Sequence, residues 1–210
     1  MGFAEPLPRL ACRRSALSAL TADARSSFWE TREFVLLRDV ATGAAPVQTT
    51  SVRVAWDADE MRVLFHAADT QIRATLTARD APLYTEEVVE VFLDPVGDGR
   101  CYFEIEVNPL NAVLDLVLRR NRSGYAKDIS WDCEGLRTCV RRDADAWSAE
   151  LAIPFPSLAA APPDPGTTWR ANFLRIDRPP GVPRELSAWS PTGIANFHVP
   201  EQFGIIEFLD

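Results

Sequence analysis

The stretch VVEVFLDPVGDGRCYFEIEVNP, residues 88–109, carries the clearest fold signal in the chain. Residues 88–94 and 101–108 alternate between two faces with a period of two, which is typical of β-strands. The turn between them, residues 95–100, contains a proline and two glycines and is too short for a parallel crossover. We therefore predict that the two segments form an antiparallel hairpin.

The same alternation recurs along most of the chain and predicts an all-β fold. Short gaps of turn residues separate most segments, which favours an antiparallel β-sandwich of immunoglobulin-like or jelly-roll appearance with minor helix, at residues 12–24 and 155–160. No linker composition divides the chain, so we expect one domain over residues 1–210, with residues 1–25 as an N-terminal extension packed on it. The predicted strands are residues 34–38, 51–56, 61–68, 88–94, 101–108, 112–118, 136–142, 147–153, 169–177 and 203–209.

Composition limits the partners that the chain can have. The net charge of −8 argues against a nucleic-acid partner, which needs a basic surface. The first twenty residues lack the apolar run of a signal peptide or membrane anchor, so we expect a cytoplasmic protein, or an extracellular one whose native signal was removed. The four cysteines form no CxxC pair, which argues against a zinc site.

One face of the 88–109 hairpin gathers acidic side chains. Glu90 lies between two apolar residues on its face of the first strand, and Tyr102, Glu104 and Glu106 share one face of the second. A charge partly removed from water needs a partner, either an arginine of the protein or a polar ligand. Carboxylates beside a ring are typical of a sugar site, because their oxygens accept hydroxyl hydrogens and the ring covers the C–H face of a pyranose. For Glu104 and Glu106, a solvated outer face is the alternative.

Five blocks of sequence occur in a characteristic order. They are SVRVAWDADEMRVLFHAAD from residue 51, PLYTEEVVEVFLDPVGDGRCYFEIEVNP from residue 82, WSAELAIPF from residue 147, AWSPTG from residue 188 and FHVPEQFGIIEF from residue 197. This ordered series resembles the carbohydrate-binding module family 9-like domains, a DOMON-like β-sandwich group. The resemblance covers residues 20–210 and implies a β-sandwich that binds sugars, often at a chain end, between two aromatic side chains. It also implies structural metal ions, usually calcium, and an association with xylan-degrading enzymes.

The resemblance also assigns site residues one by one. Tyr84 stands at the family's first aromatic position and Glu90 at the carboxylate six residues later, while Trp189 is the candidate for the second ring. Glu106 stands where the family uses a basic residue. This departure predicts an altered ligand preference, because a hydrogen-bond donor is replaced by an acceptor.

Further predictions concern residues outside this set. Trp131 lies in an acidic loop and is an additional candidate for ligand contact, whereas His198 is expected to hold the last loop by hydrogen bonds. Asp94 and Asp98 flank the turn DPVGDGR and place oxygen donors close together, as calcium prefers, although Asp–Gly turns in hairpins are also common without a metal. No cofactor is expected to be required, and calcium is the metal that these residues would accept.

Three function classes are compatible with these patterns. A glycoside hydrolase needs two carboxylates, and Glu90 with Glu104 or Glu106 would supply them, but the sequence contains no GxSxG, HExxH or phosphate loop. A haem-binding DOMON-type redox domain needs axial ligands, and Met61 and His66 fall on opposite faces of one predicted strand. We therefore predict a non-catalytic binding domain for a small-molecule or oligosaccharide ligand, with no membrane partner.

Overall fold

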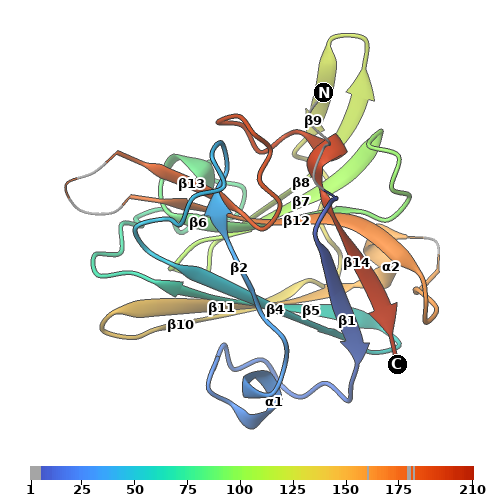
Figure 1. Cartoon of the computed structure of the whole chain (residues 1–210), viewed down its shortest axis with the longest axis horizontal. Helices are drawn as coiled ribbons and strands as arrows, with labels where there is room; N and C mark the ends of the chain where they lie inside the picture. Colours follow the sequence, from blue (N-terminus) through green and yellow to red (C-terminus); the bar gives the residue numbers. More distant parts are fainter. Residues whose placement is uncertain (1–5, 160, 179–180, 182) are drawn as a thin grey trace.

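The structure is a computed structural model that describes residues 6–159, 161–178, 181 and 183–210. Figure 1 shows two layers of strands with little helix, which confirms the predicted β-sandwich class. The first layer contains β10 (Arg137–Arg142), β11 (Ala146–Pro154), β5 (Glu60–Ala68), β4 (Thr50–Trp56) and β2 (Val35–Leu36). The second contains β14 (Gly204–Leu209), β12 (Thr168–Asp177), β6 (Val88–Asp94), β7 (Cys101–Val107), β8 (Val113–Asn121) and β9 (Gly124–Asp128), while β13 (Glu185–Ala188) pairs with both β12 and β3 (Arg38–Asp39).

Strand β1 (Arg9–Arg14) joins the two layers at one end of the sandwich. It pairs in parallel with β14 along most of its length and with β4 at its last two residues. The predicted helix over residues 12–24 is therefore wrong, because this segment begins as a strand and continues without helix. Leu10 and Cys12 alternate with polar or small neighbours and are buried, so the segment has strand periodicity that arginine-rich composition disguises. Residues 1–5 of the predicted extension lie outside the described residues.

The main core fills the space between the two layers. In β6, Val89, Val91 and Leu93 belong to this core, and the alternating residues face the other way. Trp56, Trp147 and Trp169 are also buried there, as their positions in apolar strand patterns predict. Each fully buried apolar side chain of this size stabilises the fold by about 1.5 to 3 kcal/mol.

A second apolar cluster covers the outer face of the second layer. Val88 and Phe92 of β6, Tyr102 of β7 and Leu174 of β12 belong to it, and segments between the strands, including Phe197, close over them. Every residue of β6 is consequently buried, on both faces. The same enclosure surrounds the acidic residues of this face.

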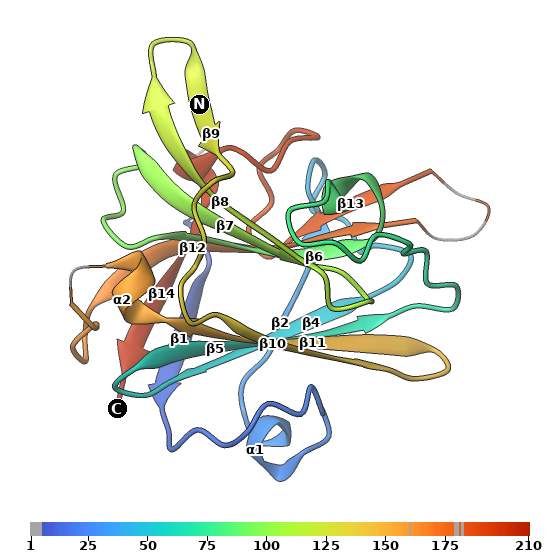
Figure 2. The ribbon, with the colours of Figure 1, turned by 180° about the vertical axis from the view of Figure 1, so that it is seen from behind.

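Helices are few and short in the described part of the chain. Helix α1 (Ser27–Glu30) packs Trp29 on the outer face of the first layer, against Ala55 and Leu64. Helix α2 (Phe155–Leu158) follows β11 directly, where the sequence predicts a short helical turn. Figure 2 shows the β8–β9 hairpin projecting beyond the sandwich, on the side of the second layer that faces away from the first.

Candidate functional site

Three glutamates lie together on the outer face of the second layer. Glu90 of β6 stands directly opposite Glu106 of β7 in the antiparallel register, and Glu104 is two residues along β7 on the same face. None of the three side chains is more than 3% exposed. The predicted gathering of acids is present, but the solvated outer face considered for Glu104 and Glu106 is wrong, because loops cover this part of the sheet.

A pocket of about 190 Å³ opens above Glu90 and Glu104. Tyr84, in the 3-10 helix η1 (Leu83–Thr85), contributes a half-exposed ring to its wall, and Lys127 reaches it from β9. Since liquid water occupies about 30 Å³ per molecule, the pocket has the volume of about six waters and suits one small polar ring. The remaining lining comes from Ile176, Arg184, Leu186 and residues 195–198.

Several buried carboxylate oxygens at or beside this pocket have no hydrogen-bond partner among the described residues. They are Oε2 of Glu104, which lines the pocket, and both oxygens of Glu106, which lies two residues further along β7 and is not among the lining residues. The nearest charged neighbour of Glu104 Oε2 is the Lys127 ammonium, at 4.0 Å, which is beyond hydrogen-bond distance. Buried polar atoms in folded proteins are almost always paired, so Glu104 Oε2 is the oxygen that a ligand in the pocket could satisfy.

Burial controls the protonation of these glutamates. It raises the pKa of Glu90 and of Glu106 well above the ordinary value of 4.5, and the neighbouring Glu104 carboxylate adds to both shifts. The pKa of Glu104 is also raised by burial, although Lys127 opposes the shift. Glu104 and Glu106 lie within hydrogen-bonding reach of each other, and that bond forms only when one of them holds a proton.

His198 ties the pocket wall to the sheet. Burial, and then the charge of Lys127, lowers the pKa of His198 to about 4, so the ring is neutral near pH 7. Lys127 Nζ lies 3.2 Å from His198 Nε2 and can only donate, so Nε2 accepts and the ring proton sits on Nδ1. That Nδ1–H donates to the Tyr102 hydroxyl over 2.9 Å. The predicted loop-holding role of His198 is thus present, but the ring lines the pocket as well.

Trp189 does not line this pocket, and its predicted role as the second aromatic clamp requires correction. The side chain is only 6% exposed and belongs to the core between the layers, with its ring centroid 5.5 Å from that of Phe173. Its backbone N–H donates to the Phe173 carbonyl over 2.8 Å. A methyl group on Gly204 would come within 2.5 Å of the indole, so the ring packs directly on that backbone. Trp189 directly follows β13, and its ring is buried because it packs against Phe173 and Gly204, contacts that sequence spacing alone does not reveal.

Trp131 and Tyr102 also lie away from the pocket surface. Trp131 packs on Phe103 with ring centroids 4.9 Å apart and borders a different hollow, beside Asp132 and Glu134. Tyr102 is fully buried beneath the pocket wall, where it positions His198. Neither side chain is among the groups that line the pocket above Glu90.

The carboxylates of the Asp94–Asp98 turn bond to the backbone of the turn. Asp94 accepts hydrogen bonds from the backbone N–H groups of Gly97 and Gly99, each over 2.8 Å, and Asp98 accepts one from Arg100. Gly97 and Gly99 both have positive φ, as this tight turn requires. These bonds give both side chains a role in the hairpin turn, and the calcium site at Asp94 and Asp98 stays a prediction.

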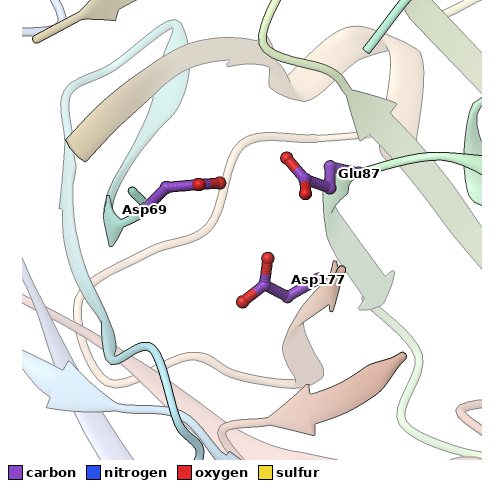
Figure 3. Close-up of side chains that lie close together, drawn as sticks. All are labelled: Asp69, Glu87 and Asp177. Carbon is purple, nitrogen blue, oxygen red and sulfur yellow. The ribbon is translucent and has the colours of Figure 1, made fainter. Parts of the chain in front are cut away.

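A different acidic cluster lies where three strands begin or end. Figure 3 shows Asp69, which follows β5, Glu87, which precedes β6, and Asp177, the last residue of β12, pointing toward one another. One oxygen of each lies within 4.8 Å of the others, and all three residues are buried. The Arg175 guanidinium lies 3.0 Å from Asp69 and 2.9 Å from Asp177. Glu87 Oε1 remains buried without a partner among the described residues, and burial raises the pKa of Glu87 to about 7.

Sequence reasoning missed some residues of both sites. Lys127 lies on a strand that was not predicted, and Asn196 and Phe197 come from an irregular segment. Lys127 is the one lysine of the chain, which is a signal that could have marked it. Asp69 directly follows one predicted strand and Asp177 ends another, and these positions could have indicated the acidic cluster.

The fold and the pocket together define a class, a β-sandwich binding domain with a small acidic pocket on one outer sheet face. The chain belongs to Carbohydrate-binding family 9, whose sequence pattern matches residues 36–208. It is accordingly a carbohydrate-binding domain of the kind that acts without catalysis.

Solved structures share this fold at low sequence identity. A candidate carbohydrate-binding protein from Bacteroides uniformis ATCC 8492 superposes with a TM-score of 0.78 at 19% identity, covering 97% of this chain and 100% of that one. A family 9 module from Caldicellulosiruptor kristjanssonii in complex with cellotriose gives 0.73 at 17% identity, with 96% and 94% covered. The module from that organism in complex with glucose gives 0.70 at 17%, with 96% and 95% covered. None of the curated proteins compared with the chain matches it.

The described residues contain few helices, all of them short. None of their helices is long and apolar enough to cross a membrane.

Proposed function

We propose that the domain captures one sugar ring, free or at the end of an oligosaccharide, in the pocket above Glu90 and Glu104. The observation that carries the proposal is the combination of buried carboxylates at the floor and a half-exposed Tyr84 ring in the wall of a pocket the size of a small ring. Carboxylates accept hydrogen bonds from sugar hydroxyls, and an aromatic face covers the apolar C–H face of the ring. Family membership and the glucose and cellotriose bound to related modules support the same ligand class.

A one-sided aromatic contact distinguishes this proposal from a two-ring clamp. Tyr84 supplies the stacking surface, and Phe197 and His198, from the segment that follows β13, also line the pocket. Each such contact contributes about 0.5 to 1.5 kcal/mol, and each net hydrogen bond about 1 kcal/mol. Binding of modest affinity, in the micromolar to millimolar range, follows from a site of this size.

The experiment is a calorimetric titration of wild type and two Tyr84 variants with glucose and cellotriose. Tyr84→Ala is expected to weaken binding about tenfold, while Tyr84→Phe, which keeps the ring, retains most of the affinity. Phe34→Ala is the matched control, because Phe34 is also half-exposed but does not line this pocket. Equal affinity of wild type and Tyr84→Ala would contradict the assigned wall, and absence of binding to both sugars would contradict the proposal itself.

We also propose that Asp69, Glu87 and Asp177 hold a calcium ion. The donor set fits, because calcium prefers carboxylate oxygens and Glu87 Oε1 is buried without a partner among the described residues. A surface hollow lined by Gln48, Asp69 and Thr70 borders the cluster on the side of Asp69. When bound, the ion would supply positive charge that links the ends of β5 and β12 to the start of β6.

Thermal unfolding with calcium or with a chelator tests this second proposal. Calcium at a hundred times its dissociation constant is expected to stabilise the wild type by about 2.7 kcal/mol. Glu87→Gln should lose most of this response, whereas Glu134→Gln, on an exposed glutamate outside the cluster, should keep it. An unchanged unfolding midpoint of the wild type in calcium and in chelator would overturn the assignment.

A further inference from the structure

We infer that the pocket selects sugars that carry a protonated amino group, so that its preferred ligand class is the amino sugars. The inference rests on the proposed function, since it assumes that a sugar ring enters the pocket above Glu90 and Glu104. It adds the chemical feature of the ligand that the floor of the pocket recognises.

The first support is the balance of charge around the floor. Three carboxyl groups, Glu90, Glu104 and Glu106, lie within one patch of two adjacent strands. The described cations at the pocket are Lys127, with a half-exposed side chain, and Arg184, which is exposed at the rim. Lys127 directs its ammonium to His198 Nε2, and it stays 4.0 Å from Glu104. The floor therefore has more buried acid than the neighbouring cations neutralise at contact distance.

The second support is the kind of hydrogen-bonding group that the floor lacks. The carboxylate oxygens at the floor are acceptors, and one of them, Glu104 Oε2, is buried without a donor among the described residues. An ammonium group provides three donors and no acceptor, whereas a hydroxyl provides one donor and two acceptor sites. Hydrogen bonds from a cation to a buried carboxylate are also shorter and stronger than those from a neutral hydroxyl. An ammonium group therefore matches these acceptors better than a hydroxyl does.

A metal ion fits this floor less well than an ammonium group. Among the described residues, two acidic groups bring one oxygen from each of three side chains within 4.8 Å of one another. These are Asp69 with Glu87 and Asp177, and Asp80 with Asp115 and Asp132; the three pocket glutamates do not form such a group. Their oxygens are spread over a wider patch, which suits a cation that sits on a sugar ring and is held by several separate hydrogen bonds.

Binding of an ammonium group also has a proton balance that can be measured. The buried glutamates share protons in the free protein, because their carboxylates crowd one another. A bound ammonium favours the ionised carboxylates, so its entry releases protons to solvent. The other titratable groups near the floor include Tyr102, which burial keeps neutral, and His198, which is neutral near pH 7; Tyr84, Lys127 and Arg184 also line the pocket. Neither Tyr102 nor His198 is expected to supply the released proton.

The experiment compares glucosamine, N-acetylglucosamine and glucose by calorimetry on the full chain at pH 6, where a free amine is protonated. We expect glucosamine to bind at least about tenfold more tightly than glucose. N-acetylglucosamine, which has a neutral amide in place of the amine, should lose this advantage. The apparent binding enthalpy of glucosamine should change with the ionisation enthalpy of the buffer, because protons are released.

Variants test whether the carboxylates at the pocket floor cause the preference for glucosamine over glucose. Glu106→Gln keeps the shape of the side chain but cannot ionise when an ammonium group binds, so the ratio of glucosamine to glucose affinity should fall several-fold. Glu134→Gln, on an exposed glutamate away from this pocket, is the control that should keep the ratio. The comparison of the three sugars on wild type needs no variant, so the test stands even if Glu106→Gln fails to fold.

The possible outcomes distinguish failure of the amino-sugar inference from failure of the proposed sugar site. Glucose binding as tightly as glucosamine, in a Tyr84-dependent manner, would overturn the amino-sugar inference and leave the proposed sugar site intact. Failure of all three sugars to bind would overturn both. A glucosamine preference that Glu106→Gln leaves unchanged would also overturn the inference, because the charge of the floor would then play no part.

Discussion

Tyr84 and Trp189 are the two rings that the family resemblance assigns to the site, and their surroundings differ sharply. Tyr84 is 48% exposed and borders the pocket, while Trp189 is 6% exposed and packs in the core. An exposed ring can be removed with little change in packing, whereas a buried ring leaves a cavity. Substitutions at the two positions should therefore affect different properties, ligand affinity at Tyr84 and stability at Trp189.

Trp189→Ala is expected to lower the free energy of unfolding by about 3 to 5 kcal/mol, because the indole packs against Phe173 and on the Gly204 backbone. Chemical denaturation of the variant and the wild type measures the difference. Tyr84→Ala serves as the comparison and should change stability by less than about 1 kcal/mol. A stable Trp189→Ala variant with lost sugar binding would show that the ring belongs to the site after all.

At the scale of single elements, β6 and β7 explain why acids can occupy a covered face. Each strand contributes one face to the core between the layers, and this face holds the hairpin in place. The opposite face is free to carry Glu90, Glu104 and Glu106, at a cost in desolvation that a ligand can offset. The same alternation that builds the sandwich thus positions the floor of the pocket.

The cost of burying these acids depends on pH. Glu106 binds its proton more tightly in the folded than in the unfolded chain, since its pKa is raised. Stability contributed by this side chain is therefore lost as the pH rises above the ordinary value of 4.5, toward the raised pKa. Glutamine at position 106 does not titrate and should escape this loss.

Glu106→Gln should accordingly stabilise the ligand-free protein relative to wild type, and increasingly so as the pH rises above the ordinary value of 4.5 toward the raised pKa. The difference in unfolding free energy should grow by at most about 1.4 kcal/mol per pH unit. Denaturation curves at several pH values measure it, and the contribution of His198 cancels because both proteins contain that residue. A difference independent of pH would show that Glu106 ionises in the folded protein as easily as in water.

The strands themselves could be predicted well from periodicity. Residues 88–94 form β6 with the predicted bounds, and other predicted strands, such as 169–177, differ from the observed ones by a residue or two. Strands β1, β9 and β13 were missed. Polar β9 and the four-residue β13 lack a clear apolar alternation, so tertiary pairing rather than local sequence makes them strands, while arginines disguise the alternation that β1 does have.

The site could be predicted only in part, for a related reason. Glu90, Glu104 and Glu106 are placed by strand alternation, which sequence reveals. The wall from Asn196 to His198 lies in irregular chain, where the position of a side chain depends on turns and long-range contacts. Burial of Trp189 likewise depends on Phe173 and Gly204, which belong to different strands.

At the scale of the whole molecule, the core and the pocket lie on opposite faces of the second sheet. The main core lies between the two sheets, and the pocket lies on the outer face of the second sheet, where the segments between strands enclose it. Figures 1 and 2 show both layers from opposite sides. This separation allows the ligand site to vary in chemistry while the sandwich keeps its packing.

A crystal structure of the protein soaked with cellotriose would show directly whether a sugar ring binds in the pocket above Glu90. We expect a sugar ring there, against the Tyr84 ring and within hydrogen-bond distance of the Glu90 or Glu104 carboxylate. A sugar bound elsewhere, for example in the hollow beside Trp131, with the pocket above Glu90 filled only by solvent, would contradict it.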